Sequence, residues 1–156
     1  MPTPASGTLP CRRASGMPRR GVLDEARRAG ARLRIWVVKG DPGLDGFHLS
    51  EDSPATDGLV DRAAALEAPF LYDLACVAVL TRDKRRAIRH VVEGYRSLHP
   101  EVEGELEHLD TFVRLRWMAN AIYFADRIER DVFRGSVDPE ANHKGLAQAY
   151  AGIRYR

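Results

Sequence analysis

The segment FLYDLACVAVL, residues 70–80, constrains the fold more than any other part of the sequence. Ten of its eleven residues are apolar, and only Asp73 interrupts the run. A segment without a polar face has to be buried, and Pro69, directly before it, is a residue type favoured at helix starts. The sequence therefore predicts a buried helix at residues 70–80, entered through Pro69.

The segments on the two sides of this helix differ in pattern. Short apolar runs between turn residues predict strands before it, at residues 35–38, 47–49 and 58–61. Helices are expected, chiefly from apolar residues at helical spacing, at residues 22–34, 83–98, 100–131 and 142–150. The strand IWVV at 35–38 is expected to be buried, and Asn142 to cap the last helix. The predicted fold class is therefore α+β, mainly helical.

Composition indicates one domain preceded by a tail. Residues 1–21, rich in Pro, Gly, Ser and Arg, lack hydrophobic periodicity and are expected to be disordered or poorly packed. Residues 22–156 have the length of one domain, and an apolar content of 44% for the chain is enough to form a core. No run of eighteen apolar residues predicts a membrane span, and no signal-peptide pattern is present, so cytoplasmic localisation is expected. Cys11 and Cys76 are expected to be reduced thiols.

The charge is distributed unevenly along the chain. The net charge is +2, but residues 1–40 carry nine basic and two acidic side chains. This basic segment lacks the interleaved aromatic residues typical of proteins that bind single-stranded nucleic acid. No nucleic-acid partner is therefore expected.

Acidic residues end two of the predicted strands. Asp41 and Asp45 lie in the stretch WVVKGDPGLDGFHL, on a turn rich in Gly and Pro, and Asp61 ends the strand at 58–61. Such a carboxylate can act as a base or bind a metal ion, but it can also begin a turn or cap the next element. The residue types alone leave these alternatives open.

Three short motifs, taken in order, resemble one known family. They are KGD at 39–41, GLVD at 58–61 and LYDLA at 71–75. Their order and spacing are similar to the catalytic segment of the aminoglycoside phosphotransferase family, which includes homoserine-kinase-like and choline-kinase-like enzymes. In that family the motifs read His-Gly-Asp-x-x-x-x-Asn, Gly-Leu-Ile-Asp-Trp and Leu-Tyr-Asp-Leu-Ala. The resemblance covers residues 22–152.

The resemblance implies a protein-kinase-like C-terminal lobe, with a small β-hairpin unit followed by a helical bundle. The implied reaction is ATP-dependent phosphorylation of a small-molecule hydroxyl of unidentified structure, such as an aminoglycoside-type acceptor. Asp41 would be the catalytic base, and Asp61 would bind the Mg²⁺ that bridges the ATP phosphates. Asp45 is interpreted as a turn residue. Asp73 is expected to be a structural acid that braces neighbouring loops.

The sequence also departs from the family pattern. Lys39 stands in place of the loop His, and this change is expected to remove a hydrogen-bonding group. Gly46 stands in place of the loop Asn, and Arg62 in place of the aromatic residue after Asp61. The residues before 35 are too few to encode a nucleotide-binding lobe with its glycine-rich loop and strand lysine. The expectation is therefore a truncated phosphotransferase, with a catalytically inactive remnant that acts as a binding or interaction module as the alternative.

Three further expectations concern packing and the surface. A lobe that evolved against another lobe is expected to expose an apolar face, so a homo-oligomer is expected. Trp117, Tyr123 and Phe124 are expected in the core, or alternatively in an acceptor pocket. The five His residues have no mutual ligand spacing and are interpreted as surface or packing residues.

Overall fold

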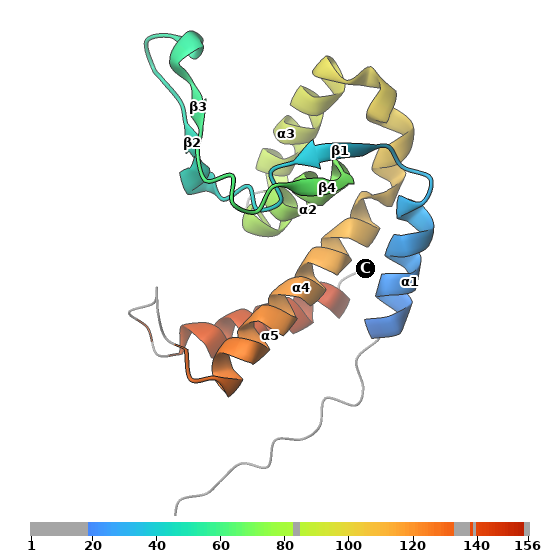
Figure 1. Cartoon of the computed structure of the whole chain (residues 1–156), viewed down its shortest axis with the longest axis vertical. Coiled ribbons are helices and arrows are strands. Elements are labelled where there is room, and N and C mark those ends of the chain that lie inside the picture. Colours follow the sequence, from blue (N-terminus) through green and yellow to red (C-terminus); the bar gives the residue numbers. More distant parts are fainter. Residues whose placement is uncertain (1–18, 83–84, 133–137, 139, 155–156) are drawn as a thin grey trace, which may run out of the picture.

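The computed structural model describes residues 19–82, 85–132, 138 and 140–154 (Figure 1). The helices are α1 Arg19–Gly30, α2 Leu71–Leu80, α3 Arg85–Leu98, α4 Leu109–Glu129 and α5 Ala141–Arg154. The strands are β1 Ile35–Val38, β2 Phe47–His48, β3 Gly58–Leu59 and β4 Leu66–Pro69. Three 3-10 helices span Leu44–Gly46, Pro54–Thr56 and Pro100–His108. The fold is α+β and mainly helical, as the sequence predicts.

The strands form two separate antiparallel pairs. Strand β1 pairs with β4 so that Ile35 lies opposite Pro69 and Val38 opposite Leu66. Strands β2 and β3 form a short hairpin, which projects away from the helices (Figure 1). The β1–β4 pair packs on the first core cluster, which contains Val38 and Ala68.

Helix α2 is the buried helix that the sequence predicts. Leu71, Leu74 and Ala75 are fully inaccessible to solvent and belong to the first core cluster. They pack together with Phe112 of α4 and with the residues of the β1–β4 pair. Because α2 has no polar face, it is covered on several sides by other elements.

Helix α4 connects the parts of the structure, since it contacts α1, α2 and α5. Its residues Trp117, Met118 and Ala121 form a second core cluster with residues of these three helices. Those partners are Val22 of α1, Val79 of α2, and Ala149 and Ile153 of α5. Helix α4 is therefore held in place by packing on more than one of its faces.

We expect Gly152→Ala to loosen the α4–α5 contact. A Cβ at position 152 would lie 2.3 Å from the ring of Trp117, which is itself buried. Overpacking of this kind costs about 1–3 kcal/mol, more than the gain of roughly 1 kcal/mol from the helix propensity of Ala. The free energy of unfolding from urea denaturation measures the effect. Gly94→Ala is the matched control because a Cβ there meets nothing within 4 Å; equal losses in both variants would contradict the predicted contact.

Several elements differ from the sequence-based expectation. Strand β1 is not buried: Val38 is, but Ile35, Trp36 and Val37 are exposed. The strand at Leu66–Pro69 was not predicted, because Pro69 was assigned to a helix start. The long helix expected from residue 100 begins as a 3-10 helix and becomes α-helical only at Leu109.

Three side-chain or terminal assignments also change. Tyr123 is 54% exposed and not a core residue, whereas Trp117 is buried as predicted. Asn142 lies within α5; its side chain accepts a hydrogen bond from Arg127 Nε and donates one to the Val132 carbonyl. Helix α1 begins at Arg19, and residues 1–18 of the predicted tail lie outside the described residues. No described helix combines the length and apolar character needed to cross a membrane.

Candidate functional site

The loop after β1 holds Asp41 in place through an unusual backbone conformation at Gly40. Gly40 has φ +82°, and a Cβ there would lie 2.0 Å from the Ala64 carbonyl oxygen. Only glycine adopts this conformation with so close an approach of another backbone segment. The KGD loop is thus packed directly against the chain that leads into β4.

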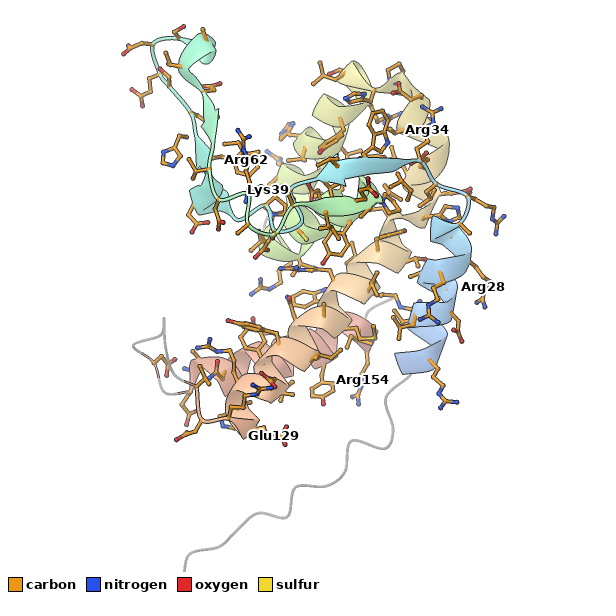
Figure 2. The ribbon with its side chains drawn as sticks, in the orientation of Figure 1. Arg28, Arg34, Lys39, Arg62, Glu129 and Arg154 are labelled. Atoms are coloured by element: carbon orange, nitrogen blue, oxygen red, sulfur yellow. The ribbon has the colours of Figure 1, made fainter. Side chains whose placement is uncertain are left out.

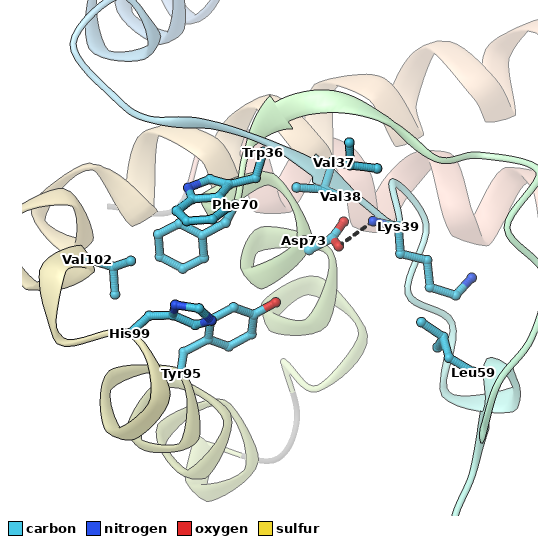
Figure 3. Close-up of a pocket in the computed structure, with 10 residues that line it drawn as sticks. All are labelled: Trp36, Val37, Val38, Lys39, Leu59, Phe70, Asp73, Tyr95, His99 and Val102. Atoms are coloured by element: carbon cyan, nitrogen blue, oxygen red, sulfur yellow. Dashed lines mark hydrogen bonds between the residues drawn. The ribbon is translucent and has the colours of Figure 1, made fainter. Parts of the chain in front are cut away.

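The carboxylate of Asp73 on α2 binds the backbone of this loop. It accepts hydrogen bonds from the backbone N–H of Lys39 at 2.8 Å and of Gly40 at 2.9 Å (Figure 3 draws the bond to Lys39). Asp73 lies in the first turn of α2 and is buried, so these two charge-assisted bonds satisfy a carboxylate that would otherwise be costly to bury. The expectation that Asp73 braces a neighbouring loop is confirmed.

Lys39 joins the two acidic segments of the site. Its ammonium group donates hydrogen bonds to the backbone carbonyl oxygens of Asp41 at 3.0 Å and of Asp61 at 2.6 Å. The expectation that Lys39 removes a hydrogen-bonding group from the loop is therefore wrong, since the longer side chain supplies two bonds. Figure 2 shows Lys39 and Arg62 where the hairpin joins the rest of the molecule.

Asp61 follows the hairpin in a left-handed backbone conformation, with φ 57°. Asp tolerates this region better than most residues. The preceding residue, Val60, donates its N–H to the carbonyl of Gly46, so both ends of the hairpin segment are fixed. The carboxylate of Asp61 is exposed at the point where the hairpin returns to the loop.

Asp41 makes an ion pair that the sequence analysis missed. Its Oδ1 accepts a hydrogen bond of 2.8 Å from Nη2 of Arg116 on α4, while the Asp41 side chain remains 59% exposed. Burial would lower the pKa of Arg116, but the nearby Cys76, Asp41 and Tyr72 more than offset this and raise it. Asp45 belongs to the 3-10 helix Leu44–Gly46 of the same turn, and its side chain lies over Gly43. This position agrees with a turn role for Asp45.

The thiol of Cys76 is buried on α2 next to the loop and is not a reactive group. Its Sγ–H points to the Gly40 carbonyl at 3.8 Å. Burial raises the pKa of this thiol to about 11, with smaller contributions from its charged neighbours, so it is protonated at neutral pH. Cys76 is a free thiol, as expected, and Cys11 lies outside the described residues.

A cavity of about 240 Å³ opens beside the loop (Figure 3). Four side chains with aromatic rings form part of its wall: Trp36 lies 5.8 Å from His99, and Phe70 stacks on Tyr95 at 5.1 Å, measured between ring centroids. Lys39 and Asp73 also line it, so the cavity and the loop share residues. Apolar walls with a few polar groups at one end suit the binding of a small organic molecule.

The acidic residues fit a magnesium ion only in part. Within the described ranges, no three His, Cys, Asp or Glu side chains gather as a metal-binding group. Asp61 offers an exposed carboxylate, whereas one oxygen of Asp41 is already paired with Arg116. Magnesium commonly keeps several waters and takes one or two carboxylates plus phosphate oxygens. Asp61 could therefore hold the ion together with a bound nucleotide, but not in a closed site made of protein alone.

Arg116 could not be found from the sequence, because it lies 75 residues from Asp41. Its position beside Trp117, which is expected in the core, is the available signal that it borders the interior. No family model matches the chain, and neither the curated proteins nor the solved structures give a match. The candidate site therefore rests on the geometry of its own residues.

Proposed function

We propose that this chain forms the acceptor- and metal-binding lobe of an ATP-dependent phosphotransferase that acts on a small-molecule hydroxyl. In this proposal the fold is a protein-kinase-like C-terminal lobe, and a second lobe supplies the groups that hold the adenine. The observation that carries the proposal is the pair of hydrogen bonds from the Lys39 and Gly40 amides to buried Asp73. They fix the backbone that presents Asp41, and a general base needs such fixed geometry.

The proposal assigns a separate role to each acidic residue. Oδ2 of Asp41 accepts the proton of the acceptor hydroxyl while Oδ1 stays paired with Arg116. Asp61 provides a carboxylate for Mg²⁺, which when bound neutralises charge on the phosphates. Lys39, bonded to the carbonyls of both residues, keeps the two segments at a constant separation. Asp73 acts on the loop backbone and does not touch the acceptor.

Paramagnetic Mn²⁺ provides a test of the metal assignment on the chain itself. With Mn²⁺ and ATP present, the Asp61 carboxylate and the phosphates should together hold the ion. We therefore expect selective broadening of the amide NMR signal of Asp61 and of the signals of Gly40 and Asp41, whose segment Lys39 bonds to that of Asp61. Without ATP the broadening should be weaker at the same Mn²⁺ concentration.

Asp61→Asn should abolish this broadening, because it removes the charged ligand. Asp52→Asn, an exposed acid elsewhere on the hairpin segment, is the matched control and should leave the broadening unchanged. Broadening centred on the acidic segment Pro100–His108, or broadening that survives Asp61→Asn, would contradict the assignment.

A second candidate function is a non-catalytic interaction module. The observation that favours it is a group of large apolar side chains that remain exposed on the two sheets and their flanks: Ile35, Trp36, Val37, Phe47, Leu49, Leu59, Val60 and Leu66. Single apolar residues are normal on a surface, but eight large ones within residues 35–66 favour a surface that a partner covers.

This second candidate predicts self-association of the purified chain. The apparent mass in sedimentation velocity should rise with concentration, and Val37→Lys together with Leu49→Lys should restore a monomer. These two side chains are 79% and 77% exposed, so the changes should leave the fold intact. Ile122→Lys on α4 is the control and should not reduce association. A wild-type chain that stays monomeric across the range would count against the module.

A further inference from the structure

The ion pair between Arg116 and Asp41 joins the rigid part of the fold to an exposed carboxylate. Arg116 lies in the middle of α4, next to Trp117, and its side chain is only 20% exposed. Asp41, by contrast, is 59% exposed, and its backbone is held by Lys39 and by the N–H of Gly43, which bonds its carbonyl at 2.8 Å. The backbone of Asp41 is therefore fixed independently of Arg116, but its side-chain rotamer is not.

We infer that Arg116 positions the Asp41 carboxylate and makes the acceptor subsite unsuitable for polycationic compounds. The inference rests on the proposed function of Asp41 as the base, and it deepens it by specifying the charge of the acceptor. Arg116 fixes Oδ1 and leaves Oδ2 as the free oxygen, so a hydroxyl can approach from one direction. Arg116 itself touches Asp41 and not the acceptor, and is a positioning residue.

The charges around Asp41 support the second half of the inference. A polyamine is recognised by carboxylates that have no cation of their own. Here the guanidinium lies 2.8 Å from Asp41, and the Lys39 ammonium binds the Asp41 carbonyl. Among the other groups close to the loop, Asp73 is bonded to two amides and Cys76 is a neutral thiol. Of the two exposed carboxylates nearby, that of Asp45 folds back over Gly43, and that of Asp61 is the one assigned to Mg²⁺. The subsite therefore fits an uncharged hydroxyl compound, such as a sugar or polyol, better than an amino-rich one.

The rotamer of Asp41 gives a readout that does not depend on activity. Three-bond NMR couplings to Cγ should show one χ1 rotamer for Asp41 in the wild-type chain and averaging in Arg116→Gln, with the Gly40 amide shift unchanged. Arg116→Lys keeps one donor and the charge, and should restore most of the single rotamer. Arg130→Gln, at the end of α4, is the control. An averaged rotamer in the wild type, or a Gly40 shift that moves together with the coupling, would overturn the positioning role.

Titration with kanamycin, a hydroxylated polyamine, tests the charge of the subsite. We expect the amide shifts of Asp41 to report binding about fivefold tighter in Arg116→Gln than in the wild type, the upper worth of an exposed ion pair. Arg116→Lys should bind as weakly as the wild type because its charge is kept. Equal binding to wild type and Arg116→Gln would overturn the inference.

The rotamer and kanamycin measurements can fail or succeed independently of the proposed function. Absence of Mn²⁺ broadening at Gly40, Asp41 and Asp61 in the wild-type chain would remove the phosphotransferase proposal, whereas the rotamer and kanamycin measurements concern only Asp41 and Arg116. A single rotamer and discrimination against kanamycin, both lost in Arg116→Gln, would establish the positioning role even if no nucleotide binds.

Discussion

Asp73→Asn is expected to lower the free energy of unfolding by about 2–4 kcal/mol, because charge-assisted hydrogen bonds are lost and a buried donor is left unpaired. The Asp73 carboxylate accepts from two amides, and an Asn side chain has one oxygen and an NH₂ group. One of the amides of Lys39 and Gly40 would therefore face another donor. Urea denaturation measures the loss, and the Gly40 amide shift reports the release of the loop.

Asp24→Asn provides the matched control for this prediction. Asp24 is an exposed acid on α1, so the same chemical change there should alter the free energy of unfolding by less than about 0.5 kcal/mol. A similar small effect at both positions would show that the loop does not depend on Asp73. A large loss in stability with an unchanged Gly40 shift would show that Asp73 acts through the helix alone.

Asp41→Asn is expected to reduce ATP-dependent phosphorylation by roughly 10²–10⁴-fold, the usual contribution of a positioned acid or base. The measurement uses a chimera in which a nucleotide lobe from a kinase-like phosphotransferase is joined before α1, so that Val22 keeps its place in the second core cluster. Asn keeps the shape of the side chain and an oxygen for Arg116, but it cannot take a proton from the acceptor. ATP turnover is followed across a panel of hydroxylated compounds, with the 156-residue chain alone measured in parallel.

Asp45→Asn in the same chimera is the control, since Asp45 is exposed and lies over its own turn. It should change turnover by less than about threefold, within the ordinary range of surface substitutions. A folded, active chimera that is indifferent to Asp41→Asn would remove Asp41 as the base. A loss of equal size in Asp45→Asn would place the chemistry on the other acid of the turn.

The local elements were predictable because they depend on residues close together in the chain. The apolar run at 70–80 has no polar face and forms a buried helix, and the short apolar runs between turns form strands. The 3-10 helix Pro100–His108 and the strand Leu66–Pro69 were not predicted. The strand exists because it pairs with β1, and no local pattern distinguishes Pro69 at a strand end from Pro69 at a helix start.

The candidate site was predictable only in its acids. The sequence by itself determined that Asp41 and Asp61 follow short strands and that Asp73 lies in the first turn of a buried helix. The tertiary structure decided their partners: Asp73 binds amides more than thirty residues earlier, and Arg116 pairs with Asp41 from 75 residues away. Periodicity specifies which face of a helix is buried, but it does not specify which distant segment covers that face. That choice is made by the packing of α2 and α4 on the loop, and it gives Lys39, Asp73 and Arg116 their roles.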